Sequence, residues 1–383
     1  MTEPIPFNRP FLTGRELAYI ARAHEQGQLA GDGSFTRSCS EWLEATTGAR
    51  RALLTHSCTA ALEMAAMLAE IGPGDEVIMP SFTFVSSANA FVARGAMPVF
   101  VDIRRDTMNI DEALIEAAIT ERTRAIVVVH YAGVACEMDA ITALAAAHDL
   151  LVIEDAAHAL LATYHGRPLG SIGHLGTLSF HETKNIISGE GGALLVNDAR
   201  FSDRAEIIRE KGTDRSLFFR GLVDKYTWVD VGSSYLPGEI IAAFLYAQME
   251  EAESITARRL QLWGRYHAAF ESLEWSGLVR RPVVPEGCVQ NGHMYYLVLP
   301  DLAARTRLIE GLKGQDIHAV IHYVPLHSSP MGQRVGRLGS RMANTIEAGD
   351  RLVRLPLWVG LEEHQDRVID AVTEAVLTSS VST

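Results

Sequence analysis

The chain has 383 residues, of which 48% are hydrophobic and 21% are charged. This balance is typical of globular proteins and excludes a chain that is disordered throughout. The 34 Lys and Arg residues are outnumbered by 47 Asp and Glu residues, so the formal net charge is −13. We therefore expect no general affinity for nucleic acid, which needs clustered cationic residues. At about 150 residues per domain, the length predicts two or three domains.

The four cysteines are widely separated and form no CxxC pair; they are Cys39, Cys58, Cys136 and Cys288. We expect reduced thiols in a cytoplasmic protein. The opening residues MTEPIPFNRPF have neither the basic nor the apolar region of a signal peptide. No uncharged apolar run reaches the ~18 residues of a membrane-spanning helix, so we expect no membrane partner.

Short apolar runs alternate with amphipathic segments over the first two thirds of the chain. The expected strands are 51–55, 76–80, 97–102, 124–130, 150–155, 175–181 and 193–197. The expected helices are 59–71, 85–94, 111–119 and 138–148. This alternation predicts an α/β domain with a mostly parallel sheet that is covered on both faces. Because no helix separates the last two strands, part of the sheet is expected to be antiparallel.

The C-terminal third has a different pattern. An amphipathic stretch over about 240–273 is expected to lead from the large domain into a smaller α+β domain. Its expected elements are a strand at 294–299, a helix at 303–312, a strand through 319–323 and a helix near 364–377. We therefore expect a large domain over 14–240 and a small domain over 241–383, with residues 1–13 joining the two.

Ligands bind beyond the carboxyl ends of the strands in an open α/β sheet. After the first expected strand, Ser57, Cys58 and Thr59 begin a helix, where free N–H and hydroxyl groups favour a phosphate. The alternative is an ordinary helix cap. After the second strand, Phe82 or Phe84 can stack on a planar ligand or pack into the core.

Two carboxylates, Glu154 and Asp155, end the strand at 150–155, and only one can face a ligand because strand side chains alternate. A buried carboxylate needs a cationic partner such as a protonated pyridine nitrogen or a metal; the alternative is a partly solvated turn. Further along, Lys184 stands before a glycine-rich loop. It is either a solvated charge or a Schiff-base amine, since burial lowers the pKa of a lysine.

These four features occur in the order that a pyridoxal phosphate enzyme needs: phosphate anchor, ring stacker, partner of the pyridine nitrogen and Schiff-base amine. A metal site is not expected, because the histidines at 174 and 181, and at 318, 322 and 327, lack the spacing of a zinc motif. The glycines at 189–192 also lack the GxGxxG spacing of a dinucleotide site.

Several motifs resemble the DegT/DnrJ/EryC1/StrS family of sugar aminotransferases over nearly the whole chain. They are PFNRP (6–10), GPGDEVI (72–78), EDAAH (154–158), SFHETKN (179–185), YVPLH (323–327) and RLPL (354–357). The stretches LAGDG (29–33), FHETKN (180–185) and GSSYL (232–236) are similar to members that aminate C4 of dTDP-4-keto-6-deoxyglucose. The resemblance implies an α/β, fold-type I, pyridoxal 5′-phosphate-dependent transferase that forms a homodimer with its active sites at the interface.

The resemblance also implies roles for individual residues. Lys184 would hold the cofactor and move a proton, and Asp155 would keep the pyridine nitrogen protonated. Phe84 would stack on the ring, and His158 would lie beside its phenolic oxygen.

The phosphate would be held by Ser57, Cys58, Thr59 and Ser179. Most family members carry Asn where Ser234 stands, and that Asn reaches the cofactor phosphate of the neighbouring subunit. Ser234 can still donate one hydrogen bond, but with a shorter reach.

The nucleotide diphosphate needs positive charge, for which Arg220 and Lys225 are the candidates; a solvated loop is the alternative for both. Tyr323 and His327 are expected nearer the sugar.

The resemblance thus predicts transfer of the amino group of L-glutamate to C4 of dTDP-4-keto-6-deoxy-D-glucose. The products would be 2-oxoglutarate and a dTDP-4-amino-4,6-dideoxyhexose of galacto or gluco configuration. The alternatives are C3 amination, a sugar dehydratase that uses the same cofactor, and a cofactor-binding regulator without turnover. Because dehydratase relatives carry His at the position of Lys184, the lysine favours transamination, and with Asp155 it also disfavours a silent regulator.

Overall fold

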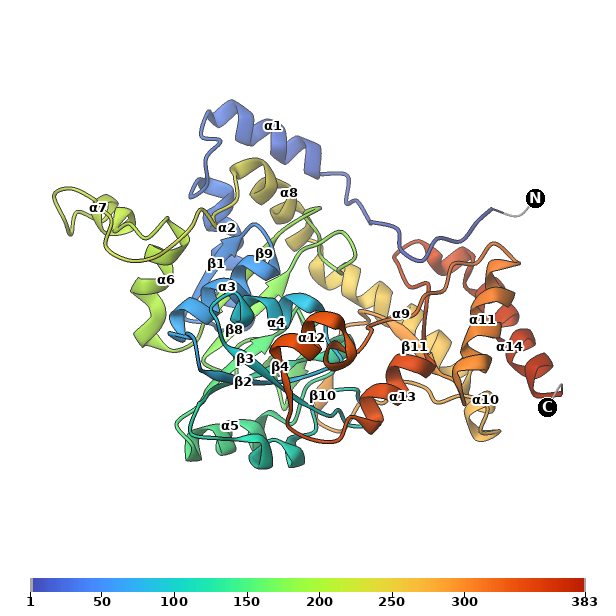
Figure 1. Cartoon of the computed structure of the whole chain (residues 1–383). Helices are drawn as coiled ribbons and strands as arrows, with labels where there is room; N and C mark the ends of the chain where they lie inside the picture. The colour runs from blue at the N-terminus through green and yellow to red at the C-terminus, as the bar shows by residue number, and fades with distance from the viewer. Residues whose placement is uncertain (1–2, 382–383) are drawn as a thin grey trace.

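The computed structural model describes residues 3–381, which form a large sheet-centred region and a smaller region beside it (Figure 1). The main sheet has eight strands. Their order is β1 (Arg51–Thr55), β9 (Gly192–Val196), β8 (Leu175–Ser179), β5 (Leu151–Asp155), β4 (Thr123–Val129), β2 (Glu76–Pro80), β3 (Met97–Val101) and β12 (Arg337–Leu338). β9 runs antiparallel to both of its neighbours, β1 and β8, and the other strand pairs of this sheet are parallel. The expectation of a mostly parallel sheet with an antiparallel part is confirmed.

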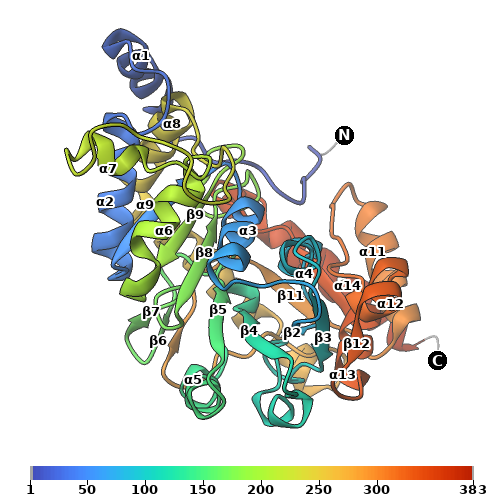
Figure 2. The same cartoon turned by 60° about the vertical axis from the view of Figure 1, so that its left-hand side comes forward.

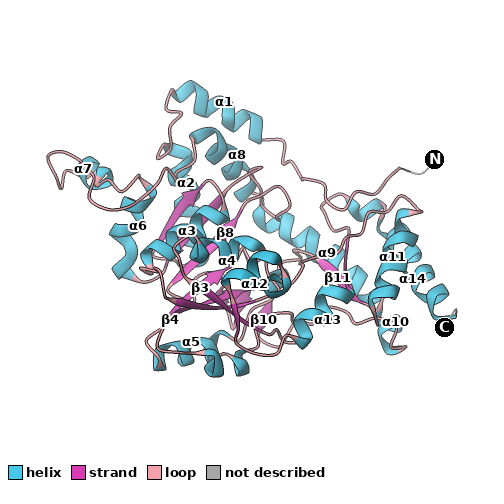
Figure 3. Ribbon diagram, viewed as in Figure 1, coloured by secondary structure: helices cyan, strands magenta, loops and turns pink. Residues whose placement is uncertain are grey.

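Helices cover both faces of this sheet (Figure 2, Figure 3). One face packs against α2 (Ser34–Thr47), α5 (Met138–Ala147) and α8 (Glu239–Met249), and the other against α3 (Cys58–Leu68), α4 (Val85–Val92) and α6 (Ser202–Arg209). Val152 of β5 belongs to the first core and its neighbour Ile153 to the second, because successive strand side chains point to opposite faces. Each strand therefore contributes to two hydrophobic cores.

The smaller region has a core of its own around β11 (Tyr295–Val298) and β13 (Leu352–Leu355), which pair antiparallel. Helices α9 (Ala252–Ala269), α11 (Leu302–Lys313) and α14 (Gln365–Val381) pack around this core. Ile5 lies in the same core, and Trp358 Nε1 donates a hydrogen bond to the Pro6 carbonyl at 3.0 Å. The first described residues therefore bind to the C-terminal region before the chain enters the large one.

Two short strands connect the regions that were expected as separate domains. β12 extends the main sheet beside β3, and β10 (Cys288–Val289) joins β6 (Thr163–Tyr164) and β7 (Arg167–Pro168) in a three-stranded sheet. The boundary near residue 240 stays a prediction, and these strand pairs cross it.

The pairing of β12 also brings a cation to a buried carboxylate. Arg337 Nη2 lies 2.6 Å from Oε2 of Glu76, which is fully buried in β2. The hydrogen bond from Arg337 lowers the pKa of Glu76 to about 2 against the opposing effect of burial, and bonds from Thr120 and Arg122 act in the same direction.

Two expected elements were wrong. The expected helix at 111–119 is a pair of 3₁₀ turns, η1 (Glu112–Leu114) and η2 (Glu116–Ala118). Ile115 and Ala118, which are three residues apart, are the buried pair, and this spacing suits a 3₁₀ turn. The expected strand at 319–323 is a single bridge between Val320 and Arg354.

The amphipathic stretch at 240–273 comprises α8, α9 and the start of α10 (Glu271–Trp275). The further described elements are α1 (Glu16–Gln26), α7 (Arg215–Phe219), α12 (Pro330–Val335), α13 (Ala343–Arg351), η3 (Tyr131–Gly133), η4 (Ala199–Phe201), η5 (Leu326–Ser328) and η6 (Leu361–Glu363). None of the helices over residues 3–381 is long and apolar enough to cross a bilayer.

Candidate active site

A cavity of about 570 Å³ opens at the carboxyl ends of β5 and β8 and is closed from the other side by residues of the C-terminal region. Nine of the expected site residues line it: Ser57, Cys58, Thr59, Phe84, Asp155, His158, Ser179, Lys184 and Tyr323. The sheet therefore brings together groups that are spread over more than half of the sequence, as the strand-end rule predicts.

The start of α3 forms one wall of the cavity. Ser57 caps the helix, since its Oγ accepts a hydrogen bond from the N–H of Ala60 at 3.1 Å. The N–H groups of Cys58 and Thr59 have no partner within residues 3–381. A Cβ atom on Gly192 would lie 2.3–2.5 Å from the backbone of Ser57 and Cys58, so only glycine allows β9 to pass this close. The result is an N-terminal cradle for an anion.

Asp155 presents a buried carboxylate to the cavity. Its Oδ2 accepts a hydrogen bond from Ser87 Oγ at 2.6 Å, and its Oδ1 accepts one from the N–H of Ala157 at 3.2 Å. Ser87 Oγ lies 2.7 Å from the Thr83 hydroxyl, which completes a short chain of donors. No cation pairs with Asp155 in the described part of the chain, so the carboxylate is available to a cationic group in the cavity.

Lys184 reaches the same space from the loop after β8. Burial lowers the pKa of its amine from 10.5 to about 8; nearby Cys58 and Asp155 raise the pKa and Arg354 lowers it. The Nζ atom has no hydrogen-bond or ion-pair partner among residues 3–381. A lysine with these properties keeps a share of its amine neutral and nucleophilic near physiological pH.

His158 stands three residues after Asp155 on the cavity wall. Its Nε2 lies 3.3 Å from the hydroxyl of Tyr323, and its ring stacks on His293 with 4.4 Å between centroids. Burial and the positive charges of Lys184 and Arg354 hold the pKa of His158 well below its usual value. The imidazole is therefore neutral.

The sequence interpretation missed cavity residues from the small region, above all Arg354. This arginine lies in β13, and its guanidinium is 4.7 Å from the ring centroid of Phe7. Its Nε is buried and has no hydrogen-bond partner, and no carboxylate among the described residues pairs with it. Burial lowers its pKa from the usual value of 12.5. The sequence signal that could have identified Arg354 is that it is the single cation in the otherwise apolar strand Leu352–Leu355.

Arg259, His293 and His322 also line the cavity without having been singled out as site residues. Arg259 donates hydrogen bonds to the carbonyls of Gly292 and His293 at 3.0 and 2.7 Å. It thereby holds the segment that carries His293 against the cavity.

Four expected residues lie outside the cavity of the single chain. Arg220 pairs with Glu206 at 2.7 Å, and Lys225 and Ser234 are exposed. His327 Nδ1 lies 2.7 Å from Ser81 Oγ, and neither residue lines the cavity. Their expected roles stay predictions.

The residues present fit pyridoxal phosphate. The free N–H groups at the start of α3 suit its phosphate, the Asp155 carboxylate suits its pyridine nitrogen, and the Lys184 amine suits its aldehyde.

A model of the DegT/DnrJ/EryC1/StrS aminotransferase family matches residues 10–373. The chain belongs to this family. It is 35% identical over 384 residues to the spore coat polysaccharide biosynthesis protein SpsC of Bacillus subtilis, and 97% of each chain is covered.

Two solved structures show the same fold. A sugar aminotransferase from Streptococcus pneumoniae in its PMP form has a TM-score of 0.90 at 27% identity, covering 98% of this chain and 99% of the other. DesV of S. venezuelae, in complex with an intermediate, has a TM-score of 0.88 at 31% identity with the same coverage. The chain is a fold-type I, pyridoxal phosphate-dependent sugar aminotransferase, and the expected fold, cofactor and enzyme class are confirmed.

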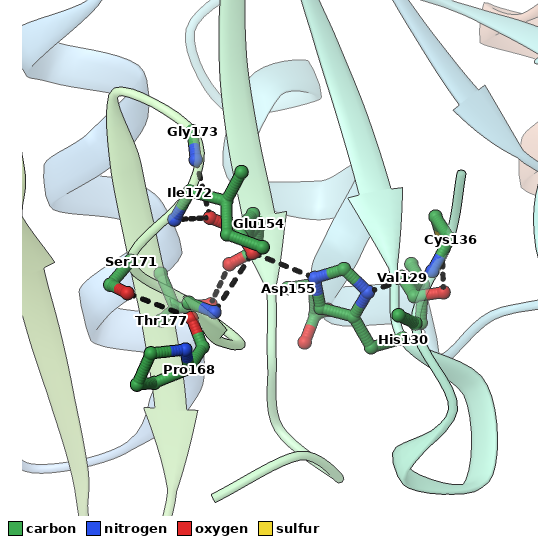
Figure 4. A network of polar contacts seen from close by, with 12 residues as sticks. Val129, His130, Cys136, Glu154, Asp155, Pro168, Ser171, Ile172, Gly173 and Thr177 are labelled. Carbon is green, nitrogen blue, oxygen red and sulfur yellow. Dashed lines mark hydrogen bonds and ion pairs between the residues drawn. The ribbon is translucent and has the colours of Figure 1, made fainter. Parts of the chain in front are cut away.

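The other face of β5 carries a second polar cluster, which Figure 4 shows. Glu154 is fully buried, and its carboxylate accepts hydrogen bonds from the N–H groups of Gly170, Ile172 and Gly173 at 2.8, 2.7 and 2.5 Å. Its fourth contact is His130 Nε2 at 2.8 Å. Since His130 Nδ1 accepts the N–H of Cys136 at 3.2 Å, Nε2 carries the hydrogen. Glu154 therefore has no capacity left for a ligand.

Proposed function

We propose that this aminotransferase moves the amino group of L-glutamate to C4 of dTDP-4-keto-6-deoxy-D-glucose. The products are 2-oxoglutarate and a dTDP-4-amino-4,6-dideoxyhexose. The observation that supports amino transfer is that the Lys184 amine, which has no partner within residues 3–381, and the Asp155 carboxylate, which has no cation paired with it there, line the same cavity. The sugar assignment is supported by the resemblance of 29–33, 180–185 and 232–236 to members that aminate this carbon.

When bound, pyridoxal phosphate withdraws electrons from the carbon that loses or gains the amino group. The N–H groups of Cys58 and Thr59, with the hydroxyls of Ser57 and Ser179, bind its phosphate. Asp155 keeps the pyridine nitrogen protonated, because a buried carboxylate favours a cation beside it.

Lys184 has two tasks in this proposal. Its amine holds the cofactor, and once released it moves a proton between substrate and cofactor carbons. A pKa of about 8 leaves a useful share of the amine neutral for this work. Phe84, at the cavity rim, covers the ring, and neutral His158 lies beside its phenolic oxygen.

Arg354 supplies the positive charge that the amino donor needs. A planar guanidinium binds a carboxylate through two parallel hydrogen bonds, and this one has no carboxylate partner within the described residues. We assign Arg354 to a carboxylate of L-glutamate. The cavity is also lined by the cofactor lysine and by Arg259, whose guanidinium already donates to the carbonyls of Gly292 and His293.

A second copy of the chain completes the site in this proposal. Large apolar side chains are exposed near the cavity rim and around α7, which projects away from the main sheet (Figure 1). They include Phe84, Val85, Phe219, Leu222 and Trp228. Such a surface is typical of an interface. In a homodimer, Arg220 and Lys225 would reach the nucleotide diphosphate and Ser234 the phosphate in the partner's cavity. We place this enzyme in the cytoplasm, in keeping with its four unpaired cysteines.

The test is a visible absorbance spectrum of the protein loaded with pyridoxal phosphate. L-Glutamate should bleach the cofactor band, and dTDP-4-keto-6-deoxyglucose should then restore it. Magnetic resonance of the product distinguishes C4 from C3 amination and galacto from gluco configuration. A band that ignores glutamate overturns the donor, and a bleached band that the sugar cannot restore overturns the acceptor.

A further inference from the structure

Two histidines of the small region, His293 and His322, face the cavity with one ring nitrogen each. His293 Nδ1 lies 3.1 Å from Asn185 Oδ1, and His322 Nδ1 lies 2.7 Å from the hydroxyl of Tyr131. The Nε2 atoms of both rings have no partner within residues 3–381 and are not shut off from the cavity space. What each Nε2 offers a ligand depends on the position of the ring hydrogen.

The hydrogen of His293 is fixed by Asn185. The amide nitrogen of Asn185 donates to the carbonyl of Asn291 at 2.8 Å, so its oxygen faces His293 and accepts. His293 Nδ1 must therefore carry the hydrogen. Its Nε2 is left as a hydrogen-bond acceptor.

Tyr131 fixes the hydrogen of His322 on the other ring nitrogen, Nε2. The Tyr131 ring is fully buried, and its hydroxyl has no other hydrogen-bond partner in the described chain. Because a buried hydroxyl needs an acceptor, it donates to Nδ1 of His322. The hydrogen of that imidazole then lies on Nε2, which becomes a donor.

Both rings are neutral. Burial, together with nearby Lys184 and Arg354, holds the pKa of His293 and of His322 well below the usual value. Both also stack on His158, with centroid separations of 4.4 Å for His293 and 6.1 Å for His322. The three imidazoles form one uncharged wall of the cavity.

An uncharged acceptor and an uncharged donor suit a hydroxyl group, which donates and accepts at once. They do not suit a carboxylate, because the lone pair of His293 would face a negative charge; Arg354 suits that group. We propose that His293 and His322 bind a hydroxyl group of the keto-sugar substrate and select for it. This inference rests on the proposed function and adds the residues that recognise the sugar.

The test separates the two half-reactions. His293→Phe and His322→Phe keep a flat ring against His158 and remove the acceptor and the donor, respectively. For each variant, the second-order rate constant of the half-reaction with dTDP-4-keto-6-deoxyglucose, measured in a single turnover, should fall about 10- to 100-fold. A site built for a hydroxyl loses its selectivity when one hydrogen-bond partner is removed. The rate of bleaching by L-glutamate should change by no more than about threefold. His318→Phe, an exposed position of the same region, is the matched control.

A binding measurement provides a readout that does not depend on turnover. Calorimetry with unreactive dTDP-6-deoxyglucose should show weaker binding to His293→Phe and His322→Phe than to wild type. The affinity for pyridoxal phosphate, titrated by absorbance, should stay unchanged in both.

The hydrogen position on His322 is tested by Tyr131→Phe. This variant should lose part of the sugar selectivity, and the double variant Y131F/H322F should be no weaker than H322F alone, because Tyr131 acts through His322. Additive losses would overturn this role of Tyr131.

The inference is overturned if both half-reactions fall equally in the histidine variants, or if the sugar half-reaction is unaffected. If instead wild type does not respond to glutamate at all, the proposed function fails, and this outcome is distinct from either result.

Discussion

The two faces of one strand, β5, carry buried carboxylates that differ in how many hydrogen-bond donors surround them. Glu154 has four donors around its two oxygens and belongs to a closed network (Figure 4). Its neighbour Asp155 receives hydrogen bonds from Ser87 and Ala157 only and opens onto the cavity. Burial is nearly complete for both, with exposed fractions of 0% and 6%.

The difference shows that burial of a charge does not by itself identify a functional residue. A saturated charge holds elements together, here the turn at 168–173 and the end of β4. A charged group that still has unused hydrogen-bonding or ion-pairing capacity, such as Asp155, Lys184 or Arg354, is available to a ligand. The following experiments test this division, from the largest expected effect to the smallest.

Replacing Lys184 by Ala should reduce turnover by at least about 10⁴-fold, since the variant loses both the anchor of the cofactor and the proton carrier. The visible band of bound cofactor should also disappear, while far-ultraviolet circular dichroism stays unchanged. Sustained steady-state transamination by this variant would contradict the assignment.

Asp155→Asn keeps the size of the side chain and removes its charge. Turnover should fall about 10²- to 10³-fold, because the pyridine nitrogen loses the carboxylate that keeps it protonated. Steady-state kinetics with saturating pyridoxal phosphate measures the loss. A variant within about threefold of wild type would remove Asp155 from the reaction.

Glu154→Gln should act on stability instead. The amide nitrogen of Gln would face N–H donors, so the free energy of unfolding should fall by about 3 kcal/mol. Urea unfolding at fixed protein concentration measures this change, with exposed Glu121→Gln as control. Activity per cofactor-loaded subunit should stay within about tenfold of wild type. Our division between the two carboxylates fails if E154Q loses more turnover than D155N.

The pH dependence of cofactor capture tests Lys184 directly. Only the neutral amine attacks the aldehyde, so in apoprotein the rate should rise about tenfold per pH unit and level off above the lowered pKa of about 8. Because the Asp155 charge raises this pKa, the midpoint should move down in Asp155→Asn. A midpoint near 10.5, the ordinary value, would show that the amine is solvated.

Ser87→Ala removes one hydrogen bond to Asp155 and leaves the carboxylate in place. We expect turnover to fall only about three- to tenfold, in line with the net worth of a single hydrogen bond to a charged group. Thr83→Ala, one step further along the same chain of hydroxyls, should have a smaller effect still. The reverse order of the two losses would contradict the chain of donors.

The sequence predicted the large region well because its signals are local. Apolar runs of five to seven residues mark β1, β2, β3, β4, β5, β8 and β9, and the polar residues just beyond them line the cavity. Alternation along β5 also showed that only one of Glu154 and Asp155 could face a ligand.

The groups from the small region could not be placed in the same way. Arg354, His293 and His322 reach the cavity only because the C-terminal region folds back over the sheet, which is a long-range event. The two-residue strands β10 and β12 are too short to leave a periodic pattern. The segment at 111–119 has the apolar spacing of a helix and was misread for that reason.

The late position of β12 in the chain has a consequence for synthesis on the ribosome. Until residues 337–338 emerge, β3 is an edge strand with unpaired backbone groups, and Glu76 lacks the cation from Arg337. An open edge of this kind pairs readily with other chains. A nascent or truncated chain that ends before β12 therefore exposes an aggregation-prone edge, which residues 337–338 cover once they are made.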